Sequence, residues 1–140
     1  MAEPATLPVL DLNVLIAMYG DNSAETITLA LSGFRREATH YVQQLQDAGQ
    51  HYVPTNNART DNVLADNALA DTARLCHSLK SMCGLVGAAK LMQLCIALEQ
   101  AARQQDLPTL QSGLLKLAGV WPETLAMLNL ILLQHGYADV

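Results

Sequence analysis

Apolar residues recur along this chain with the three- and four-residue spacing of amphipathic helices. The clearest stripe covers about six turns and ends before Gly49; its members are Ile27, Leu31, Phe34, Ala38, Tyr41, Leu45 and Ala48. Shorter stripes predict a helix over Leu12–Tyr19, another from the Asp61–Asp66 region to about Gly84, and a third over about Ala88–Gln105. A last stripe from Leu110 to Leu132 predicts a helix that Pro122 should kink or split.

These stripes predict an all-α protein. Helices joined by mostly short connections pack antiparallel, so we expect an antiparallel four-helix bundle with a short extra N-terminal helix. A single bundle domain over residues 9–140 would follow an extended leader of residues 1–8. The stretch from Gln50 to Thr60 contains Pro54 and two asparagines, which predicts a loop.

Composition and charge narrow the possible functions. Hydrophobic residues make up 51% of the 140 residues, but aromatic residues only 4%, which favours an aliphatic helical core. The net charge is −5, and no basic stripe is present, so nucleic-acid binding is not expected. The longest apolar run, Leu125–Leu133, is too short to cross a bilayer and is broken by Asn129. No basic residue precedes Arg35, which argues against a signal peptide and for a cytoplasmic protein.

The cysteines and histidines do not form a familiar metal or cofactor motif. Cys76, Cys83 and Cys95 are odd in number and lack a close pair, so packing in a reducing compartment is the favoured interpretation. No two histidines stand four residues apart, and no carboxylates join them in a ligand pattern. A glycine-rich phosphate loop is also absent from the sequence. We therefore expect no metal, no cofactor and no ATP binding.

One face of the predicted third helix carries candidate chemistry. His77, Lys80, Ser81 and Gly84 share this face, because they stand three, four and seven residues apart. The helix's apolar stripe points elsewhere; it consists of Leu75, Leu79, Met82 and Val86. His77 should therefore project outward, beside a cation and two small residues that leave room for another protein. A neutral imidazole is a nucleophile near physiological pH, and Lys80 could compensate the charge of a phosphoryl group. The simpler interpretation is a surface histidine with a lysine nearby.

The wider pattern around this face resembles the histidine-containing phosphotransfer (HPt) domains of multistep phosphorelays. Their motif is His-x-Leu-Lys-Gly/Ser, then a small residue, then Gly-Ala ten and eleven residues after the histidine; here it corresponds to His77, Leu79, Lys80, Ser81, Cys83, Gly87 and Ala88. The likeness extends to Leu91, Cys95, Leu98-Glu99, Ala102-Arg103 and, upstream, to Leu10-Asp11, Leu15, Gly20-Asp21 and Phe34. Cys76 and Leu85 depart from the usual residues, and the stretch from 50 to 66 is longer than the usual connection.

The resemblance implies a phosphoryl carrier. His77 would accept a phosphoryl group from an aspartate of one receiver domain and pass it to an aspartate of another. Lys80 would compensate phosphate charge, and Ser81 and Gly84 would provide clearance for docking. The implied partners are response-regulator receiver domains and a sensor or hybrid histidine kinase. The aspartates, and the magnesium that serves the transfer chemistry, would belong to the receivers. The chain would therefore have no catalytic cycle of its own and would not be an enzyme. A monomer is expected, because a single exposed histidine suffices, and either a free-standing protein or the end of a hybrid kinase fits.

Three other classes of function compete with this one. A helical adaptor could dock receivers or kinases without being phosphorylated. The dimerisation unit of a histidine kinase also carries a histidine on a helix bundle, but it works with an ATP-binding domain. A cofactor-binding bundle would be coloured or loaded with metal.

Overall fold

The computed structural model describes residues 7–49 and 62–136, with side chains from residue 67 onward in the second range. These residues form five helices and no strand, so the all-α prediction is confirmed. The helices are α1 (Leu12–Tyr19), α2 (Ala24–Gly49), α3 (Asn62–Val86), α4 (Ala89–Arg103) and α5 (Leu107–Gln134). The predicted loop from Gln50 to Thr60, and most of the predicted leader, lie outside the described residues.

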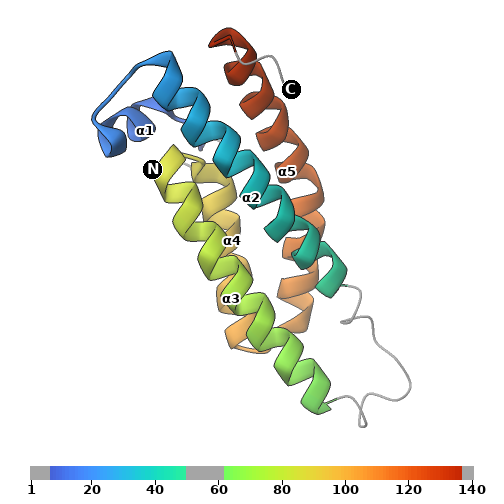
Figure 1. Ribbon diagram of the computed structural model, residues 1–140. Helices are drawn as coiled ribbons and strands as arrows, with labels where there is room; N and C mark the ends of the chain where they lie inside the picture. The colour runs from blue at the N-terminus through green and yellow to red at the C-terminus, as the bar shows by residue number, and fades with distance from the viewer. Residues whose placement is uncertain (1–6, 50–61, 137–140) are drawn as a thin grey trace.

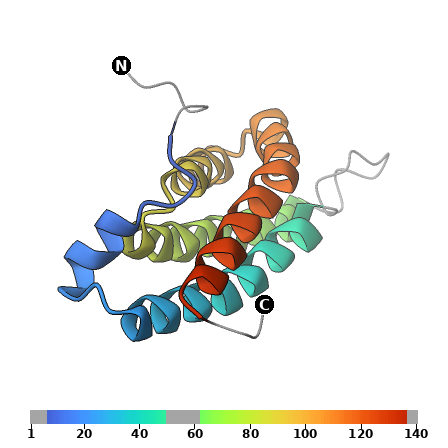
Figure 2. The same cartoon turned by 90° about the horizontal axis from the view of Figure 1, so that it is seen from above.

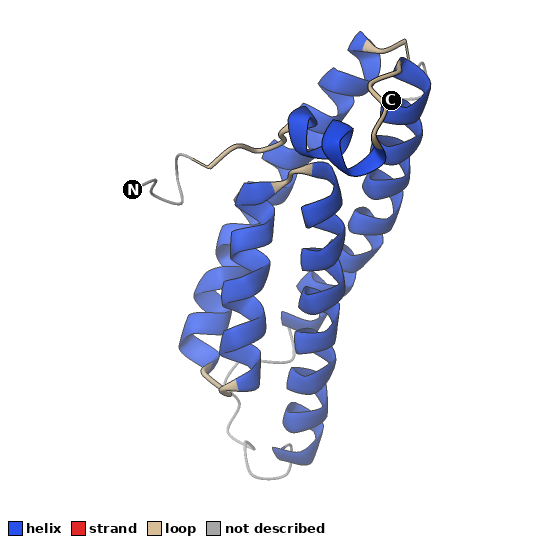
Figure 3. Cartoon of the chain, turned by 90° about the vertical axis from the view of Figure 1, so that its left-hand side faces the viewer, coloured by secondary structure: helices blue, strands red, loops and turns tan. Residues whose placement is uncertain are grey.

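The four long helices lie side by side (Figures 1 and 2). Helices α3 and α5 each pack against both α2 and α4, so they occupy diagonal positions. The short helix α1 contacts α3 and α2 near one end of the molecule (Figure 1). Away from α1, the long helices run nearly alongside one another (Figure 3). This arrangement leaves one face of α3 open to solvent, and that face carries His77.

Local signals in the sequence define the first two helices. The side chain of Asp11 accepts a hydrogen bond from the backbone N–H of Asn13 at 3.0 Å and caps the start of α1. Gly20 ends α1 in the left-handed conformation, with φ at 68°. The hydroxyl of Ser23 accepts a hydrogen bond from the N–H of Thr26 at 3.2 Å, so Ser23 caps α2. The start and end of each helix are therefore determined within a few residues.

The core is built mainly from leucine, as the composition predicts. Its largest fully buried side chains include Leu15, Leu31, Leu45, Leu79, Leu91, Leu98, Leu110, Leu117, Leu128 and Leu132. In α3 the buried residues differ from the predicted apolar stripe. Cys76 and Cys83 are fully buried, whereas Leu75 and Met82 are half-buried at the edge of the groove toward α2. Because α3 packs against two long helices, its buried face is wider than a single stripe predicts.

The turn between α3 and α4 depends on one glycine. Helix α3 continues to Val86, two residues beyond the predicted end, and Gly87 follows with φ at 74°. The backbone N–H of Asp11 donates to the carbonyl of Gly87 at 3.0 Å, which holds the segment before α1 against this turn. A β-carbon at Gly87 would collide with the carbonyl oxygen of Asp11. Both the backbone conformation and the close approach therefore require glycine.

Helix α5 is continuous from Leu107 to Gln134, so of the two outcomes expected at Pro122, a kink or a split, the split does not occur. Proline removes the hydrogen bond to the carbonyl four residues earlier, which belongs to Ala118. Both Pro122 and Ala118 are exposed, so water can bond that carbonyl. Trp121, about 100° around the helix from Pro122, is buried and belongs to the core.

Candidate functional site

His77 projects from α3 into solvent, as the helical spacing predicts. Its side chain is 59% exposed, whereas the neighbouring core positions Cys76 and Leu79 are fully buried. Successive side chains of a helix are about 100° apart, so burial of these two positions turns position 77 outward. The imidazole is thus available to another protein.

Glu99 of α4 stands beside this imidazole. Its Oε2 lies 3.3 Å from Nδ1 of His77, and its own side chain is only 12% exposed. The Nζ of Lys80 donates to Oε1 at 2.9 Å. Arg103, one turn further along α4, donates from Nε at 3.1 Å and from Nη2 at 2.9 Å to Oε2. One carboxylate therefore joins three basic side chains from two helices.

These contacts keep Glu99 ionised. The hydrogen bond from Lys80 is the main cause that lowers the pKa of Glu99 from 4.5 to about 2, and Arg103 and His77 add to it against the opposing effect of burial. A permanent carboxylate near Nδ1 favours the imidazole tautomer with its proton on that nitrogen. The other ring nitrogen, Nε2, then carries the lone pair and is the nucleophilic atom.

Lys80, the expected partner of a phosphoryl group, already has an anionic partner in the structure. Its ammonium group is paired with Glu99, and the side chain is 29% exposed. Lys80 and His77 thus lie on either side of the same carboxylate. A phosphoryl group on His77 would offer Lys80 a second anionic partner, so the lysine would have to share or leave Glu99 to reach it.

The two small residues have different surroundings. The hydroxyl of Ser81 donates to the backbone carbonyl of His77 at 3.1 Å, so it is turned back onto its own helix. Gly84 is half-buried, and a β-carbon there would meet only the sulfur of Met92, at 3.9 Å. Neither residue raises a bulky side chain next to the imidazole.

The three cysteines lie in the core behind the site. Cys76, Cys83 and Cys95 are free and fully buried. Burial raises the pKa of the Cys76 thiol, and a hydrogen bond with Cys83, together with burial, raises that of Cys95. Thiols that stay protonated are poor nucleophiles. The cysteines are therefore packing residues, as the sequence indicates.

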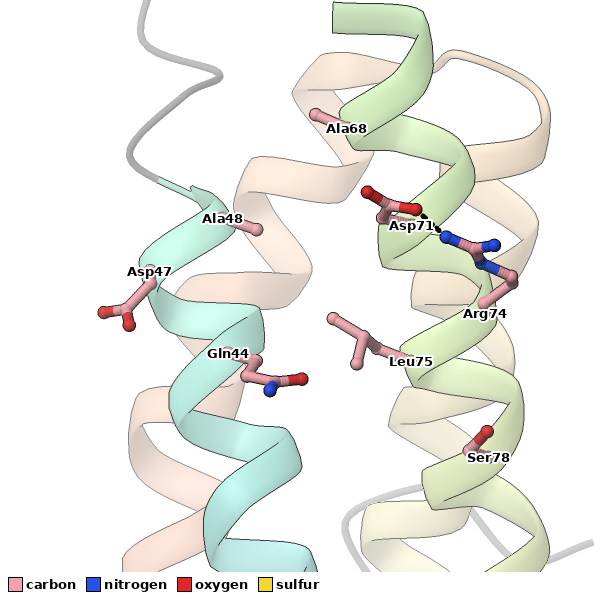
Figure 4. Close-up of a pocket in the computed structure, with 8 residues that line it drawn as sticks. All are labelled: Gln44, Asp47, Ala48, Ala68, Asp71, Arg74, Leu75 and Ser78. Carbon is pink, nitrogen blue, oxygen red and sulfur yellow. Dashed lines mark ion pairs between the residues drawn. The ribbon is translucent and has the colours of Figure 1, made fainter.

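Two grooves between α2 and α3 flank the histidine face along its length. One has a volume of about 230 Å³ and an apolar lining that includes Tyr19, Leu29, Gly33, Met82 and Leu85. The other, of about 590 Å³, lies toward the opposite end and includes Gln44, Asp47, Asp71, Arg74, Leu75 and Ser78 (Figure 4). In this second groove Asp71 pairs with Arg74, and Leu75 points into the gap between the helices. The two grooves therefore lie at opposite ends of the boundary between α2 and α3, and the second one contains charged side chains.

His40 and His135, the two other histidines among the described residues, lie apart from His77. His40 is exposed on α2, where its Nε2 lies 2.9 Å from the side-chain nitrogen of Gln44. The Nδ1 of His135 lies 2.8 Å from the carbonyl of Ile131 at the end of α5. Among the described residues, no group of three or more His, Cys, Asp or Glu side chains is arranged to hold a metal ion.

Sequence reasoning missed the role of Glu99 and Arg103. Both belong to the pairs that carry the family resemblance, but no function could be attached to them from the sequence. Their separation of four residues on one helix was the available signal, because a glutamate and an arginine at this spacing pair on the helix surface. The contact with His77 and Lys80 depends on how α4 packs against α3.

Comparison with known proteins agrees with this geometry. The family model of the Hpt domain matches residues 30–131, which is most of the chain. No curated protein and no solved structure gives a match. Hpt domains are helical bundles that serve as histidine phosphotransfer intermediates in two-component phosphorelays, rather than as classical enzymes. The matched region contains α3, α4, most of α2 and nearly all of α5, with His77 exposed on α3, and the chain belongs to the Hpt domain family.

Proposed function

We propose that this chain carries a phosphoryl group on His77 between aspartates of two receiver domains. The observation that supports this most directly is the exposed imidazole of His77, whose Nδ1 lies 3.3 Å from the ionised carboxylate of Glu99. In this proposal α2 to α5 form an antiparallel four-helix bundle, α1 is an extra short helix, and residues 9–140 make up one domain. The protein would act in the cytoplasm, and it would neither bind ATP nor hold a metal of its own.

The transfer step follows from the chemistry of the ring. Nε2 attacks the phosphorus of the receiver's aspartyl phosphate, an N–P bond forms, and the P–O bond to the aspartate breaks. The aspartate leaves as a carboxylate. The imidazole, with a proton on Nδ1 and phosphorus on Nε2, becomes a cation, and the carboxylate of Glu99 stabilises this positive charge at 3.3 Å. Transfer to the second receiver reverses these events.

Lys80 and Glu99 have distinct parts in this proposal. Glu99 is a positioning residue, because it holds the ring in one tautomer and lies next to the charge that develops on it. Lys80 compensates the charge of the phosphoryl group after partly releasing Glu99, which keeps the two contacts of Arg103. The ion pair of Lys80 and Glu99 is therefore already formed in the unphosphorylated protein.

The apolar groove beside the site is the proposed docking surface for receivers. It includes the exposed side chains of Tyr19, Leu29 and Leu85, which are 49%, 67% and 42% exposed. Leu85 stands eight residues after His77, about two helical turns along the same side of α3. A receiver that covers this groove can bring its aspartate over the imidazole, provided that Ser81 and Gly84 remain small.

The deciding experiment mixes the protein with a phosphorylated receiver domain. We expect an acid-labile, base-stable label on the wild type, no label on His77→Gln, and full label on His40→Gln, which changes another exposed histidine. Glu99→Gln should take up the label about tenfold more slowly, since it keeps the shape but loses the charge. Label on His77→Gln would refute the assignment. Receiver binding without labelling of the wild type would favour the unphosphorylated adaptor, and self-labelling with ATP would favour a kinase.

A further inference from the structure

Exposed apolar side chains gather at a second place, on the outer face of α5. Among the described residues, nine large hydrophobic side chains are exposed, and four of them belong to this helix. Leu115 is 78% exposed, Leu130 50% and Leu133 56%, and Met127 lies at their edge with 36%. Isolated exposed leucines are ordinary, but several on one helix face mark a surface that binds something.

These leucines belong to a continuous line, which we call the outer stripe of α5. Every member is exposed and none is charged; the members are Leu115, Gly119, Pro122, Ala126, Leu130 and Leu133. Their separations of three and four residues place them on one side of the helix. The opposite side faces the core, where Leu117, Trp121 and Leu128 are buried. Helix α5 therefore has two apolar faces, of which the bundle covers one.

The outer stripe is nearly symmetric about the level of Thr124. Leu115 and Leu133 each lie nine residues from that level, and Pro122 and Ala126 each lie two residues from it. Gly119 and Leu130 lie five and six residues from it. An antiparallel partner helix of the same sequence would therefore face Leu115 with Leu133, and Gly119 with Leu130. A β-carbon at Gly119 meets nothing within 4 Å, so this position has open space for a leucine.

We propose that the outer stripe of α5 is the interface of a symmetric antiparallel dimer of this chain. In a two-fold interface the same patch must complement itself, and the stripe has this property in one register. Helix α5 is also long and apolar enough to cross a membrane by length and composition. A lipid bilayer is the less suitable occupant, because Leu117 and Leu128 would have to leave the core for α5 to insert. This proposal replaces the monomer expected from the sequence.

The charges around the stripe permit two copies to approach. Lys116 and Glu123 are the only charged residues of α5, and Glu123 pairs with Lys90 of α4 at 2.6 Å. The whole negative net charge arises in residues 1–66, which contain eight acidic and three basic residues. The remainder of the chain has five of each. The outer stripe itself contains no charged residue, and the neighbouring Glu123 is already paired, so pairing does not bury an unpaired carboxylate.

The size of the stripe indicates a weak dimer. From Leu115 to Leu133 the helix rises about 27 Å, and a helix with its side chains is about 10–12 Å wide. The footprint is thus on the order of 300 Å² per copy, below the roughly 800 Å² per partner of a stable complex. We expect a reversible dimer with a dissociation constant on the order of 100 µM, which forms at high local concentration.

Sedimentation of the full chain between about 10 µM and 1 mM tests the proposal, over a range chosen to bracket that constant. The average mass of the wild type should rise toward that of a dimer. Leu130→Glu should remain monomeric over the whole range, whereas the matched control Met18→Glu, which changes an exposed hydrophobic residue of α1, should self-associate like the wild type. A monomeric wild type at 1 mM, or self-association that survives Leu130→Glu, overturns the proposal. Binding of the wild type to zwitterionic phospholipid vesicles without self-association also overturns the proposal.

Disulfide trapping tests the register. A mixture of Leu115→Cys and Leu133→Cys should give cross-linked heterodimers, because these positions face each other across the two-fold axis. Leu115→Cys alone should not cross-link, since its two copies would be about 27 Å apart. Efficient cross-linking of Leu115→Cys alone would indicate a parallel pair and overturn the antiparallel register. The three native cysteines are buried and do not interfere in the folded protein.

Discussion

Replacement of Glu99 by glutamine should destabilise the protein at neutral pH and much less in acid. Folding lowers the pKa of Glu99 from 4.5 to about 2, chiefly through the hydrogen bond from Lys80. At about 1.4 kcal/mol for each tenfold change in proton affinity, this difference corresponds to at most about 3–4 kcal/mol. Lys80 and Arg103 are 29% and 59% exposed, so water screens part of the attraction. We therefore expect a loss of about 1–2 kcal/mol at pH 7.

The pH dependence has a definite sign. A carboxyl group whose pKa is lower in the folded state stabilises the fold above its unfolded pKa, and this contribution disappears as the pH falls toward the folded pKa. The difference between wild type and Glu99→Gln should therefore be complete above about pH 5 and shrink between pH 4.5 and 2. Other carboxylates titrate in both proteins, so they cancel in the comparison.

Urea unfolding at several pH values, followed by circular dichroism and by the fluorescence of the single tryptophan, measures this difference. Glu123→Gln is the matched control. Glu123 also pairs with a lysine, at 2.6 Å, but is 46% exposed, and we expect a loss below about 0.5 kcal/mol. The reasoning is refuted if Glu99→Gln is as stable as the wild type at pH 7, or if its deficit is as large at pH 2.5 as at pH 7.

Three further changes test the packing. Gly87→Ala should cost about 2 kcal/mol or more, because it strains a positive φ and collides with Asp11. Gly33→Ala, at a position of α2 with open space for a β-carbon, should be neutral or stabilising, and thermal unfolding distinguishes the two variants. Leu79→Ala should cost about 2–5 kcal/mol in urea unfolding, because Leu79 is fully buried. The three cysteines should react with a thiol reagent only after denaturation, and rapid labelling of the native protein would contradict their burial.

The sequence correctly predicted the structural features that are determined within a single helix. The spacing of apolar residues located the five helices, and the same spacing indicated that His77 faces outward. Gly49 marked the end of α2. These features depend on contacts within about one turn, so a local pattern contains them. The exact end of α3 differed by two residues, because the turn at Gly87 is held by a contact with Asp11 from another part of the chain.

The electrostatics of the site could not be predicted in the same way. Lys80 and Glu99 are 19 residues apart, and their contact depends on the register in which α3 packs against α4. That register is set by buried side chains such as Cys83 and Cys95, which lie between the two helices. A sequence pattern shows that these residues point inward, but it does not show how far one helix slides along the other. The carboxylate that orients His77 therefore became visible only in three dimensions.

The two exposed apolar surfaces are compatible because of where they lie in the bundle. Helices α3 and α5 both pack against α2 and α4, so they occupy opposite corners. The groove with Leu29 and Leu85 lies beside the histidine face of α3, whereas the outer stripe of α5 faces away from it. Pairing through α5 would leave both imidazoles exposed, and a receiver could dock on each copy. A phosphoryl carrier must release one receiver before it engages the next, and a weak dimer raises the local concentration of carriers without covering either docking groove.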